Sequence, residues 1–293
     1  MSGDSMTPGA RLRRLLATHA PVLAPGAANA LSARIIADCG FDVVYASGAG
    51  IANWSLGVPD LGLTTMQEVV VEVNRICDAV DVPVIADADA GYGNALNVHR
   101  TVRELERAGV AAIQLEDQVD PKRCGHFEGK QVIDDAEMIA KVRAALEARD
   151  DPDLMIIART DARDVEGLDR AIERACKYRE TGADAVFLEA PLNIDELTRI
   201  GAEVPGPLVA NMVEGGKTPI VSLDELRDLG FDIVIYANLA ARAAMKAMQE
   251  VLTALREHGS SESVQHRIVT MKERNRITGM DAWRTLESRY RTN

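Results

Sequence analysis

Eight short runs rich in Val, Ile, Leu and Ala recur along the chain, and each meets a turn or a polar residue at its end. Their apolar character is continuous instead of alternating, which is typical of parallel strands covered on both faces. We therefore predict eight buried strands, at Val22–Ala24, Asp42–Ala46, Val82–Ala86, Ala111–Leu115, Leu154–Ala158, Ala185–Leu188, Pro207–Ala210 and Asp232–Tyr236.

The segments between these strands have the periodicity of amphipathic helices. One stripe consists of Val69, Val73 and Ile76, which recur at helical spacing. Similar stripes contain Val98, Val102 and Leu105; Leu168, Ile172 and Cys176; and Met245, Met248, Leu252 and Leu255. Glycines that follow helices and precede strands are expected to end those helices, as at Gly40, Gly109, Gly182 and Gly230.

Strand and helix alternating eight times predict an α/β fold, the (β/α)₈ barrel, for which about 250 residues is typical. The remainder, about residues 259–293, contains further helical stretches that end in Trp283 and Tyr290. No low-complexity segment or linker interrupts the chain, so we expect residues 1–293 to form one barrel domain with a C-terminal helical extension.

Composition limits the choice of partners and compartment. The 293 residues include 33 Lys and Arg against 45 Asp and Glu, a net charge of −12 that argues against nucleic acid or an anionic membrane. The four cysteines are far apart, no apolar run reaches the ~18 residues of a membrane span, and the first residues lack a signal peptide's apolar core. We expect a cytoplasmic protein that contacts neither nucleic acid nor membrane.

Polar residues collect directly after the predicted strands. In a barrel of this class, the C-terminal ends of the strands carry the chemistry, whereas the opposite rim serves stability. Such residues follow seven of the strands, as in Tyr45–Gly50, Asp87–Gly93, Glu116–Gln118, Arg159–Asp161, Glu189–Ala190, Asn211–Gly216 and Tyr236–Asn238. The concentration predicts a polar ligand site at that rim.

Asp87 and Asp89 are the strongest metal candidates. They are two positions apart, so along a strand both side chains point to the same side. With Glu116 from the next strand they form an oxygen-rich set that suits Mg²⁺, which keeps several waters and takes one or two carboxylates directly. The alternative is a solvated acidic loop or helix cap; the glycine-rich turn that follows favours the metal.

Cys124 lies in the segment Lys122-Arg123-Cys124-Gly125-His126, after the fourth strand. Neighbouring cations are expected to lower the pKa of the thiol and make it reactive. The other three cysteines lie in helical patterns and are predicted to be small core residues. Arg159 either pairs with Asp161 or offers a planar fork to a carboxylate. Gly215-Gly216 is either a tight turn or an anion-holding backbone.

Several motifs occur together in a familiar order: Tyr45-Ala46-Ser47-Gly48, Asp87-Ala88-Asp89-Ala90-Gly91-Tyr92-Gly93, Glu116-Asp117-Gln118, Lys122-Arg123-Cys124-Gly125-His126 and Asn211-Met212-Val213-Glu214-Gly215-Gly216-Lys217-Thr218-Pro219. They resemble the isocitrate lyase/phosphoenolpyruvate mutase superfamily, from about Val22 to Leu255. The length of the chain is similar to the short branch of 2-methylisocitrate lyases and 2,3-dimethylmalate lyases.

The resemblance implies a barrel whose eighth helix is exchanged with a neighbour, in a homotetramer. It implies Mg²⁺, with Mn²⁺ as an alternative, held by Asp87 and Asp89 with Asp60 and Glu116 around the ion. The substrate contacts that it implies are Tyr45, Ser47, Gly48, Ala49, Cys124, Gly125, Arg159, Glu189, Asn211 and Arg242. Ala49 and Asn211-Met212-Val213 depart from the usual methylisocitrate lyase pattern, whereas Arg242 matches it.

These residues predict a Mg²⁺-dependent carbon–carbon lyase. It would cleave a 2-hydroxy di- or tricarboxylate into an α-keto acid such as pyruvate and a second carboxylate. In this scheme Cys124 is the general acid, beside Lys122 and with His126 returning its proton, and Tyr45 is a base or relay for the substrate hydroxyl. Arg159 holds the second carboxylate, assisted by Asn211.

Three alternatives stay open at this point. A carboxyphosphonoenolpyruvate phosphonomutase shares the aspartate, cysteine and Asn211–Pro219 motifs, and only Arg242, a cation for a further carboxylate, favours the lyase. An oxaloacetate decarboxylase of the same superfamily has no need of a cysteine acid. A barrel that binds a metabolite without turnover would be expected to have lost Cys124 or a metal carboxylate.

Overall fold

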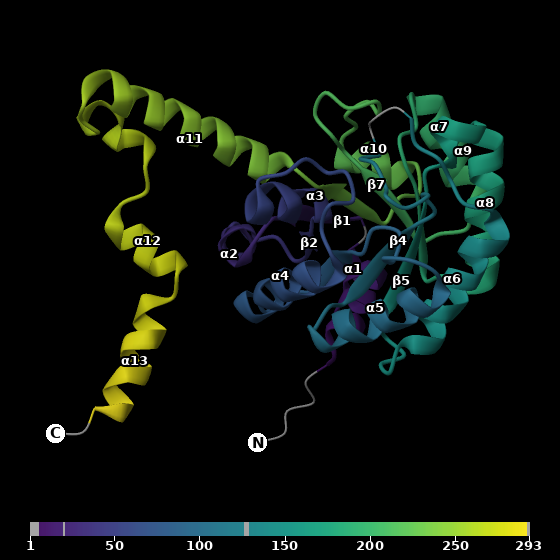
Figure 1. Cartoon of the computed structure of the whole chain (residues 1–293), viewed down its shortest axis with the longest axis horizontal. Coiled ribbons are helices and arrows are strands. Elements are labelled where there is room, and N and C mark those ends of the chain that lie inside the picture. Colours follow the sequence, from purple (N-terminus) through teal and green to yellow (C-terminus); the bar gives the residue numbers. More distant parts are fainter. Residues whose placement is uncertain (1–5, 20, 126–128, 292–293) are drawn as a thin grey trace.

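The computed structural model describes residues 6–19, 21–125 and 129–291. Eight parallel strands form a closed barrel in which each strand pairs with the next and β8 pairs with β1 (Figure 1). The strands are β1 (Val22–Ala27), β2 (Val44–Ala46), β3 (Val84–Asp87), β4 (Ala112–Glu116), β5 (Met155–Thr160), β6 (Ala185–Leu188), β7 (Leu208–Asn211) and β8 (Ile233–Tyr236). The predicted (β/α)₈ barrel and all eight predicted strands are confirmed.

Helices surround the barrel, and the last of them extend away from it (Figure 1). They are α1 (Pro8–His19), α2 (Ala30–Asp38), α3 (Gly48–Ile51), α4 (Met66–Ala79), α5 (Ala95–Arg107), α6 (Asp135–Ala148), α7 (Ala162–Glu166), α8 (Leu168–Thr181), α9 (Ile194–Glu203), α10 (Leu223–Asp228), α11 (Leu239–His258), α12 (Met271–Ile277) and α13 (Met280–Tyr290), with the π-helical turn η1 (Ala52–Leu56) and the 3₁₀ helix η2 (Glu262–Arg267). The predicted stripes on α4 and α5 are buried against the strands.

Strand β1 is three residues longer than its apolar run, because it continues through Pro25 and Gly26. Gly26 pairs with Tyr45 of β2, and a Cβ on Gly26 would lie 1.9 Å from the Ala237 carbonyl oxygen. Only a glycine allows the chain after β8 to pass this close to β1. The close approach brings the ends of β1, β2 and β8 together at the rim where the polar residues collect.

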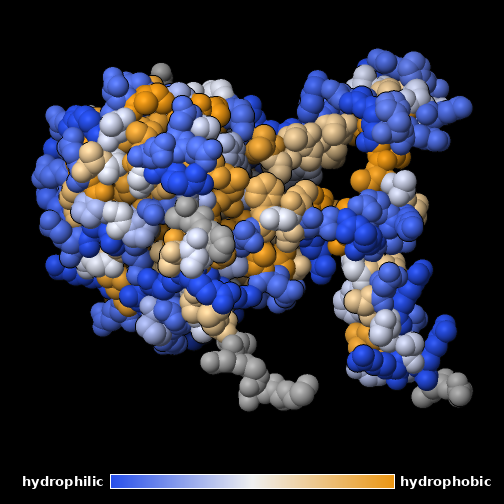
Figure 2. Space-filling view, turned by 180° about the vertical axis from the view of Figure 1, so that it is seen from behind, coloured by the Kyte–Doolittle hydropathy of each residue, from blue (hydrophilic) through white to orange (hydrophobic). Residues whose placement is uncertain are grey.

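The predicted C-terminal extension leaves the barrel. Helix α11 projects from β8, and α12 and α13 follow it outside the barrel (Figure 1). Most of the apolar stripe on α11 is exposed, with Leu252 56% accessible, and Figure 2 shows hydrophobic side chains along this arm. Arg276 of α12 pairs with Asp38 of α2. No helix in the described part of the chain is both long and apolar enough to cross a membrane.

Candidate active site

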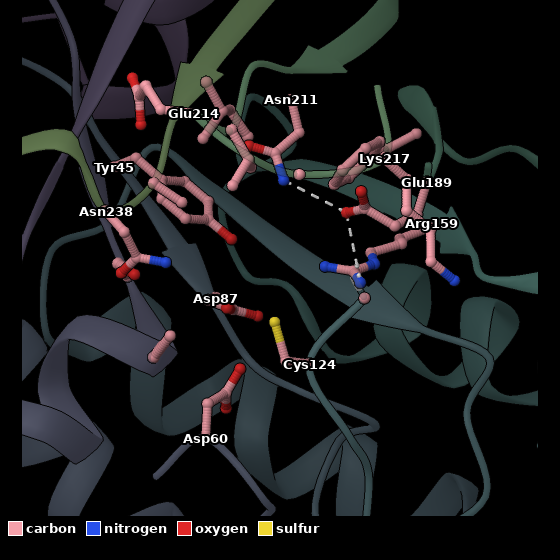
Figure 3. A pocket seen from close by; sticks show the side chains of 18 of the residues that line it. Tyr45, Asp60, Asp87, Cys124, Arg159, Glu189, Asn211, Glu214, Lys217 and Asn238 are labelled. Carbon is pink, nitrogen blue, oxygen red and sulfur yellow. Dashed lines mark hydrogen bonds and ion pairs between the residues drawn. The ribbon is translucent and has the colours of Figure 1, made fainter. Parts of the chain in front are cut away.

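A cavity of about 420 Å³ opens at the C-terminal ends of the strands. Its position agrees with the rule that barrel chemistry lies at this rim. Figure 3 shows side chains from β2, β3, β5, β6 and β7, and from the loops after β4 and β8, converging on it. The cavity brings together most of the predicted site residues, namely Tyr45, Ser47, Ala49, Asp60, Asp87, Lys122, Cys124, Gly125, Arg159, Glu189, Asn211 and Arg242.

Three predicted residues lie behind the cavity wall: Gly48, Asp89 and Glu116. Asp87 ends β3, and its Oδ2 accepts a hydrogen bond from the Gly48 amide at 3.3 Å. A Cβ on Gly48 would lie 2.9 Å from Asp87 Oδ2 and 3.3 Å from Asp89 Oδ1, so a glycine is needed where the two carboxylates converge. His126, the remaining predicted residue, lies outside the described residues.

The strand argument for Asp89 is wrong, although Asp89 does lie close to Asp87. Strand β3 ends at Asp87, and Asp89 has a left-handed backbone with φ of +46°, so the alternation of a strand no longer applies. Asp89 lines a second cavity, of about 340 Å³, that also contains Tyr92. Asp87 therefore lines the first cavity, whereas Asp89 lines the second.

The Lys122 ammonium bridges two of the predicted metal carboxylates. It donates a hydrogen bond to Asp60 and lies 2.8 Å from Asp89 Oδ1, and its side chain is 5% exposed. Burial raises the pKa of Asp89 to about 6, even though Lys122 opposes the shift. Lys122 therefore serves these carboxylates, whereas the sequence had suggested a role beside the Cys124 thiol.

Arg159 makes the pair with Asp161, the first of the two roles that its sequence context left open. Its Nε lies 2.9 Å from Asp161 Oδ2 and 3.3 Å from Glu116 Oε2, and its Nη2 lies 3.3 Å from Glu189 Oε2. The guanidinium also lies 5.1 Å from the centroid of the Phe187 ring, a cation–π contact that fixes its plane. Because Arg159 still lines the cavity, its fork is held in place for an anion.

Tyr45 is a buried phenol beside the acidic set. Its hydroxyl accepts a hydrogen bond from Gln114 Nε2 at 3.0 Å, and Gln114 Nε2 lies 3.5 Å from Asp87 Oδ1. Burial and the Asp87 carboxylate raise the pKa of Tyr45 well above its ordinary value. A neutral phenol donates hydrogen bonds well but is a weak base, so the geometry favours a relay over a base.

Sequence reasoning missed several residues of the site. Phe187 of β6 and Ile235 of β8 give the cavity an apolar floor. Asn238 also lines the cavity, and it belongs to the polar run predicted after the eighth strand. The exposed guanidinium of Arg242 donates to the Glu214 carbonyl oxygen at 2.7 Å and lies 3.6 Å from its carboxylate. Gln114 carried a usable signal, because a lone amide within an apolar strand must find a polar partner.

The oxygen donors fit a hydrated cation. Among the described residues no cluster of three or more His, Cys, Asp or Glu forms a ready-made metal cage. Glu116 Oε1 is nevertheless buried and has no hydrogen-bond partner in the described part of the chain, which a metal-bound water could satisfy. Asp87 reaches the cavity itself. One direct carboxylate, with others acting through water, is how proteins commonly hold Mg²⁺.

Comparison with known proteins agrees with this picture. The chain matches the family model described as phosphoenolpyruvate phosphomutase over residues 12–256, and it belongs to that family. It is 48% identical to 2,3-dimethylmalate lyase of Eubacterium barkeri over 98% of this chain and 99% of the relative. It is 47% identical to 2-methylisocitrate lyase of Aeropyrum pernix, over 91% of this chain and 85% of the relative.

Among solved structures, the fold matches a phosphonopyruvate hydrolase in complex with oxalate and Mg²⁺. The TM-score is 0.88 at 33% identity, over 97% of this chain and 99% of the other. The superfamily predicted from the motifs is therefore confirmed. The similarity to two named lyases also confirms the predicted enzyme class, a carbon–carbon lyase.

Proposed function

We propose that this protein cleaves a 2-hydroxy di- or tricarboxylate of the 2,3-dimethylmalate or 2-methylisocitrate type into an α-keto acid and a second carboxylate. The observation that carries the proposal is that Asp87, Cys124 and Arg159 line one cavity. This cleavage requires a carboxylate that holds a cation on the hydroxyl side of the bond that breaks. On the other side it requires a thiol acid and a guanidinium. The two lyases that resemble the chain support the substrate class.

The cofactor in this proposal is Mg²⁺. Asp87 would hold the ion directly, with Asp60, Asp89 and Glu116 acting through water. When bound, Mg²⁺ would acidify the substrate hydroxyl and orient the carboxylate beside it. Support comes from the unpaired Glu116 oxygen and from the Mg²⁺ named with the related hydrolase.

The other residues act on the half of the substrate that departs. Arg159, whose Nε and Nη2 already bond Asp161, receives the second carboxylate on the part of its guanidinium that faces the cavity, and Asn211, whose Nδ2 bonds Glu189 Oε2 at 3.3 Å, supplies a further polar contact. As the carbon–carbon bond breaks, its electron pair stays on the carbon beside that carboxylate. Cys124 then transfers its Sγ proton to this carbon, and the thiolate is reprotonated through water or His126.

Tyr45 handles the proton of the substrate hydroxyl. Its raised pKa keeps it a phenol at neutral pH, so it accepts the hydroxyl proton only while passing its own phenol proton to water, and that proton balances the one that later returns to the Cys124 thiolate. In this proposal the binding surface is completed by Ser47, Ala49, Gly125 and Glu189, and Gly48 lies behind it with its amide bonded to Asp87. Arg242, at the outer edge of the cavity, would meet a third carboxylate where the substrate has one.

We further propose that residues 1–293 act as one barrel domain that assembles into a homotetramer through exchange of α11. The exposed apolar stripe on α11, with Met248 and Leu255 48% and 42% accessible, supports an intermolecular contact. None of the four cysteines, all within the described residues, forms a disulfide, which supports a reducing compartment such as the cytoplasm. Multi-angle light scattering of the full chain gives the mass of the assembly directly.

A substrate panel tests the proposed reaction. The protein is incubated with Mg²⁺ and a series of 2-alkylmalates and isocitrates, and α-keto acid release is followed with and without a chelator. We expect release from at least one compound, its loss in chelator and its return with Mg²⁺ or Mn²⁺. Absence of product from every compound would remove the lyase proposal.

The main alternative to a lyase is a phosphonomutase, because the matching family model is described as a phosphomutase. Phosphonate substrates distinguish the two. The same preparation is incubated with phosphonopyruvate and with carboxyphosphonoenolpyruvate, and phosphorus NMR follows the phosphorus–carbon bond. We expect no turnover of either. Turnover of a phosphonate in the absence of keto acid release would assign the protein to the phosphonomutases.

A further inference from the structure

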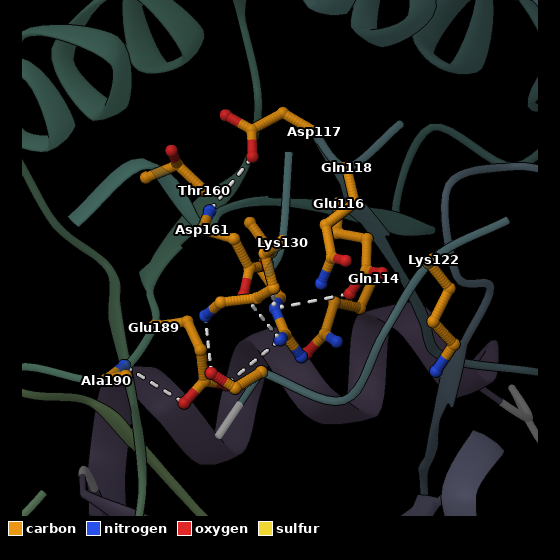
Figure 4. A network of polar contacts seen from close by, with 12 residues as sticks. Gln114, Glu116, Asp117, Gln118, Lys122, Lys130, Thr160, Asp161, Glu189 and Ala190 are labelled. Atoms are coloured by element: carbon orange, nitrogen blue, oxygen red, sulfur yellow. Dashed lines mark hydrogen bonds and ion pairs between the residues drawn. The ribbon is translucent and has the colours of Figure 1, made fainter. Parts of the chain in front are cut away.

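Lys130 is a buried cation that the proposed reaction does not use. It follows the loop after β4, six positions beyond Cys124, and its side chain is 0% exposed. Its ammonium lies 3.0 Å from Asp161 Oδ1 (Figure 4). It also donates a hydrogen bond to the Gly125 carbonyl and lies 3.7 Å from Asp164 Oδ2. An ammonium is costly to bury unless its partners compensate it.

Asp161 joins Lys130 to Arg159. Its Oδ2 accepts from Arg159 Nε at 2.9 Å, and its Oδ1 accepts from Arg159 Nη2 at 3.1 Å as well as from Lys130. Burial by itself would raise the pKa of Asp161, but Arg159 and Lys130 lower it to about 2. One ionised carboxylate therefore holds both cations at once.

Gly125 is packed directly against the same arginine. A Cβ at this position would lie 2.3 Å from Arg159 Nη2 and 2.7 Å from Glu189 Cγ. The backbone next to Cys124 thus has no room to shift towards Arg159. Lys130 holds the Gly125 carbonyl and, through Asp161, the guanidinium against which Gly125 rests.

We propose that Lys130 is a positioning residue that fixes Cys124 relative to Arg159 through its bonds to Gly125 and Asp161. Lys130 is not part of the cavity lining, so it acts through these partners instead of touching substrate. The inference rests on the proposed function only in treating Cys124 and Arg159 as the acid and the carboxylate binder. Asp164, which also lies near the Lys130 ammonium, pairs with Lys217 Nζ at 2.8 Å. The network of ion pairs around Lys130 therefore continues to the loop after β7.

Lys130→Met tests this role, because it keeps the aliphatic stem and removes the ammonium. Arg159 keeps both hydrogen bonds to Asp161, so KM for the keto-acid-releasing substrate should change less than about threefold. Misplacement of Cys124 should lower kcat about 10- to 100-fold. Lys130→Gln, which retains an N–H donor, should fall between Met and the parent protein, and it keeps the test open if Lys130→Met does not fold.

Lys177→Met is the matched control. Lys177 also pairs with two carboxylates, Asp135 at 2.6 Å and Glu173 at 2.7 Å, but on the outer helical layer. Its removal should leave kcat within about twofold of the parent. Near-ultraviolet circular dichroism and thermal midpoints confirm folding for each variant. Unchanged kcat in folded Lys130→Met, or an equal loss of kcat in Lys177→Met, would overturn the positioning role.

A second readout does not depend on any lyase activity. The alkylation rate of Cys124 by iodoacetamide is measured by mass spectrometry, with the exposed Cys39 of the same molecule as the internal reference. We expect the ratio of Cys124 to Cys39 alkylation to rise at least threefold in Lys130→Met and to stay unchanged in Lys177→Met. An unchanged ratio in Lys130→Met contradicts the inference. A raised ratio in a protein that releases no keto acid upholds the positioning and removes only the proposed function.

Discussion

The Lys122 ammonium lies 2.8 Å from Asp89 Oδ1, with both side chains at most 7% exposed, and it also bonds the Asp60 carboxylate. Removing one member of such a buried group leaves the others as uncompensated charges. Lys122→Met should therefore cost about 3–5 kcal/mol of folding free energy, measured by urea denaturation. Lys177→Met, which breaks a more exposed pair, should cost at most about 1 kcal/mol. Equal losses would show that Lys122 has no special stabilising role.

Cys124→Ser should abolish turnover but not binding. A serine hydroxyl is a far weaker acid than a thiol, so protonation of the carbanion would be slower. We therefore expect kcat to fall at least about 100-fold. The affinity for the substrate and Mg²⁺, measured by calorimetry, should stay within about threefold. Cys39→Ser at an exposed cysteine is the control and should retain full activity. Turnover that survives in Cys124→Ser would end the acid role.

The fold could be predicted from the sequence because each strand of the barrel is buried on both faces. Burial on both faces requires a continuous apolar run, such as Ala111–Leu115. The observed β4 differs from this run by one residue at each end. The extra length of β1 could not be foreseen, since Pro25 and Gly26 read as a turn. They continue the strand because Pro25 pairs with Tyr236 of β8 and Gly26 pairs with Tyr45 of β2.

Much of the candidate site was also predictable, since parallel strands of a barrel end at the same rim. Asp89 marks where this reasoning fails, because a left-handed residue past the end of β3 turns its side chain into a second cavity. Lys130 could not be found by motif, because its proposed role depends on contacts of its ammonium with the Gly125 carbonyl and with Asp161 that no spacing predicts. Phe187 carried no polar signal, and only the structure shows that it lines the cavity and lies against the Arg159 guanidinium.

The raised pKa of Tyr45 makes a prediction about pH. Because burial and Asp87 raise this pKa above its ordinary value, the phenol stays protonated from pH 6 to 9, and its ionisation should not limit activity there. Tyr45→Phe should lower kcat about 10- to 100-fold through the lost proton relay, while the alkaline limb of the kcat profile keeps its position. An alkaline limb that disappears in Tyr45→Phe would mean that Tyr45 ionises during the reaction.

Gly48→Ala should damage the proposed metal site without damaging the fold. The added Cβ would lie 2.9 Å from Asp87 Oδ2, so the carboxylate must move, and the Mg²⁺ concentration for half-maximal activity should rise at least about tenfold. Gly50→Ala is the matched control in the same helix, α3, where the nearest atoms are the Ala28 and Ser47 Cβ atoms at 3.2 Å. Thermal midpoints should be similar for the two variants. An equal Mg²⁺ requirement in the two variants would show that Gly48 does not shape the proposed Mg²⁺ site.

Glu214 offers a way to decide between a di- and a tricarboxylate substrate. Its carboxylate lies 3.6 Å from the Arg242 guanidinium at the edge of the cavity and competes there with any third substrate carboxylate. Both side chains are partly exposed, so the competition is worth up to about 1 kcal/mol, a factor of about five. Glu214→Gln should therefore lower KM for 2-methylisocitrate up to about fivefold.

The dicarboxylate 2,3-dimethylmalate provides the internal control in the same variant. It has no third carboxylate for Arg242, so its KM should not change in Glu214→Gln, and the ratio of the two KM values isolates the contact. Arg242→Gln should reverse the preference, raising KM for 2-methylisocitrate alone. If KM changes equally for both substrates in both variants, Arg242 does not bind the third carboxylate. Discrimination between the substrates must then come from the apolar floor of Phe187 and Ile235.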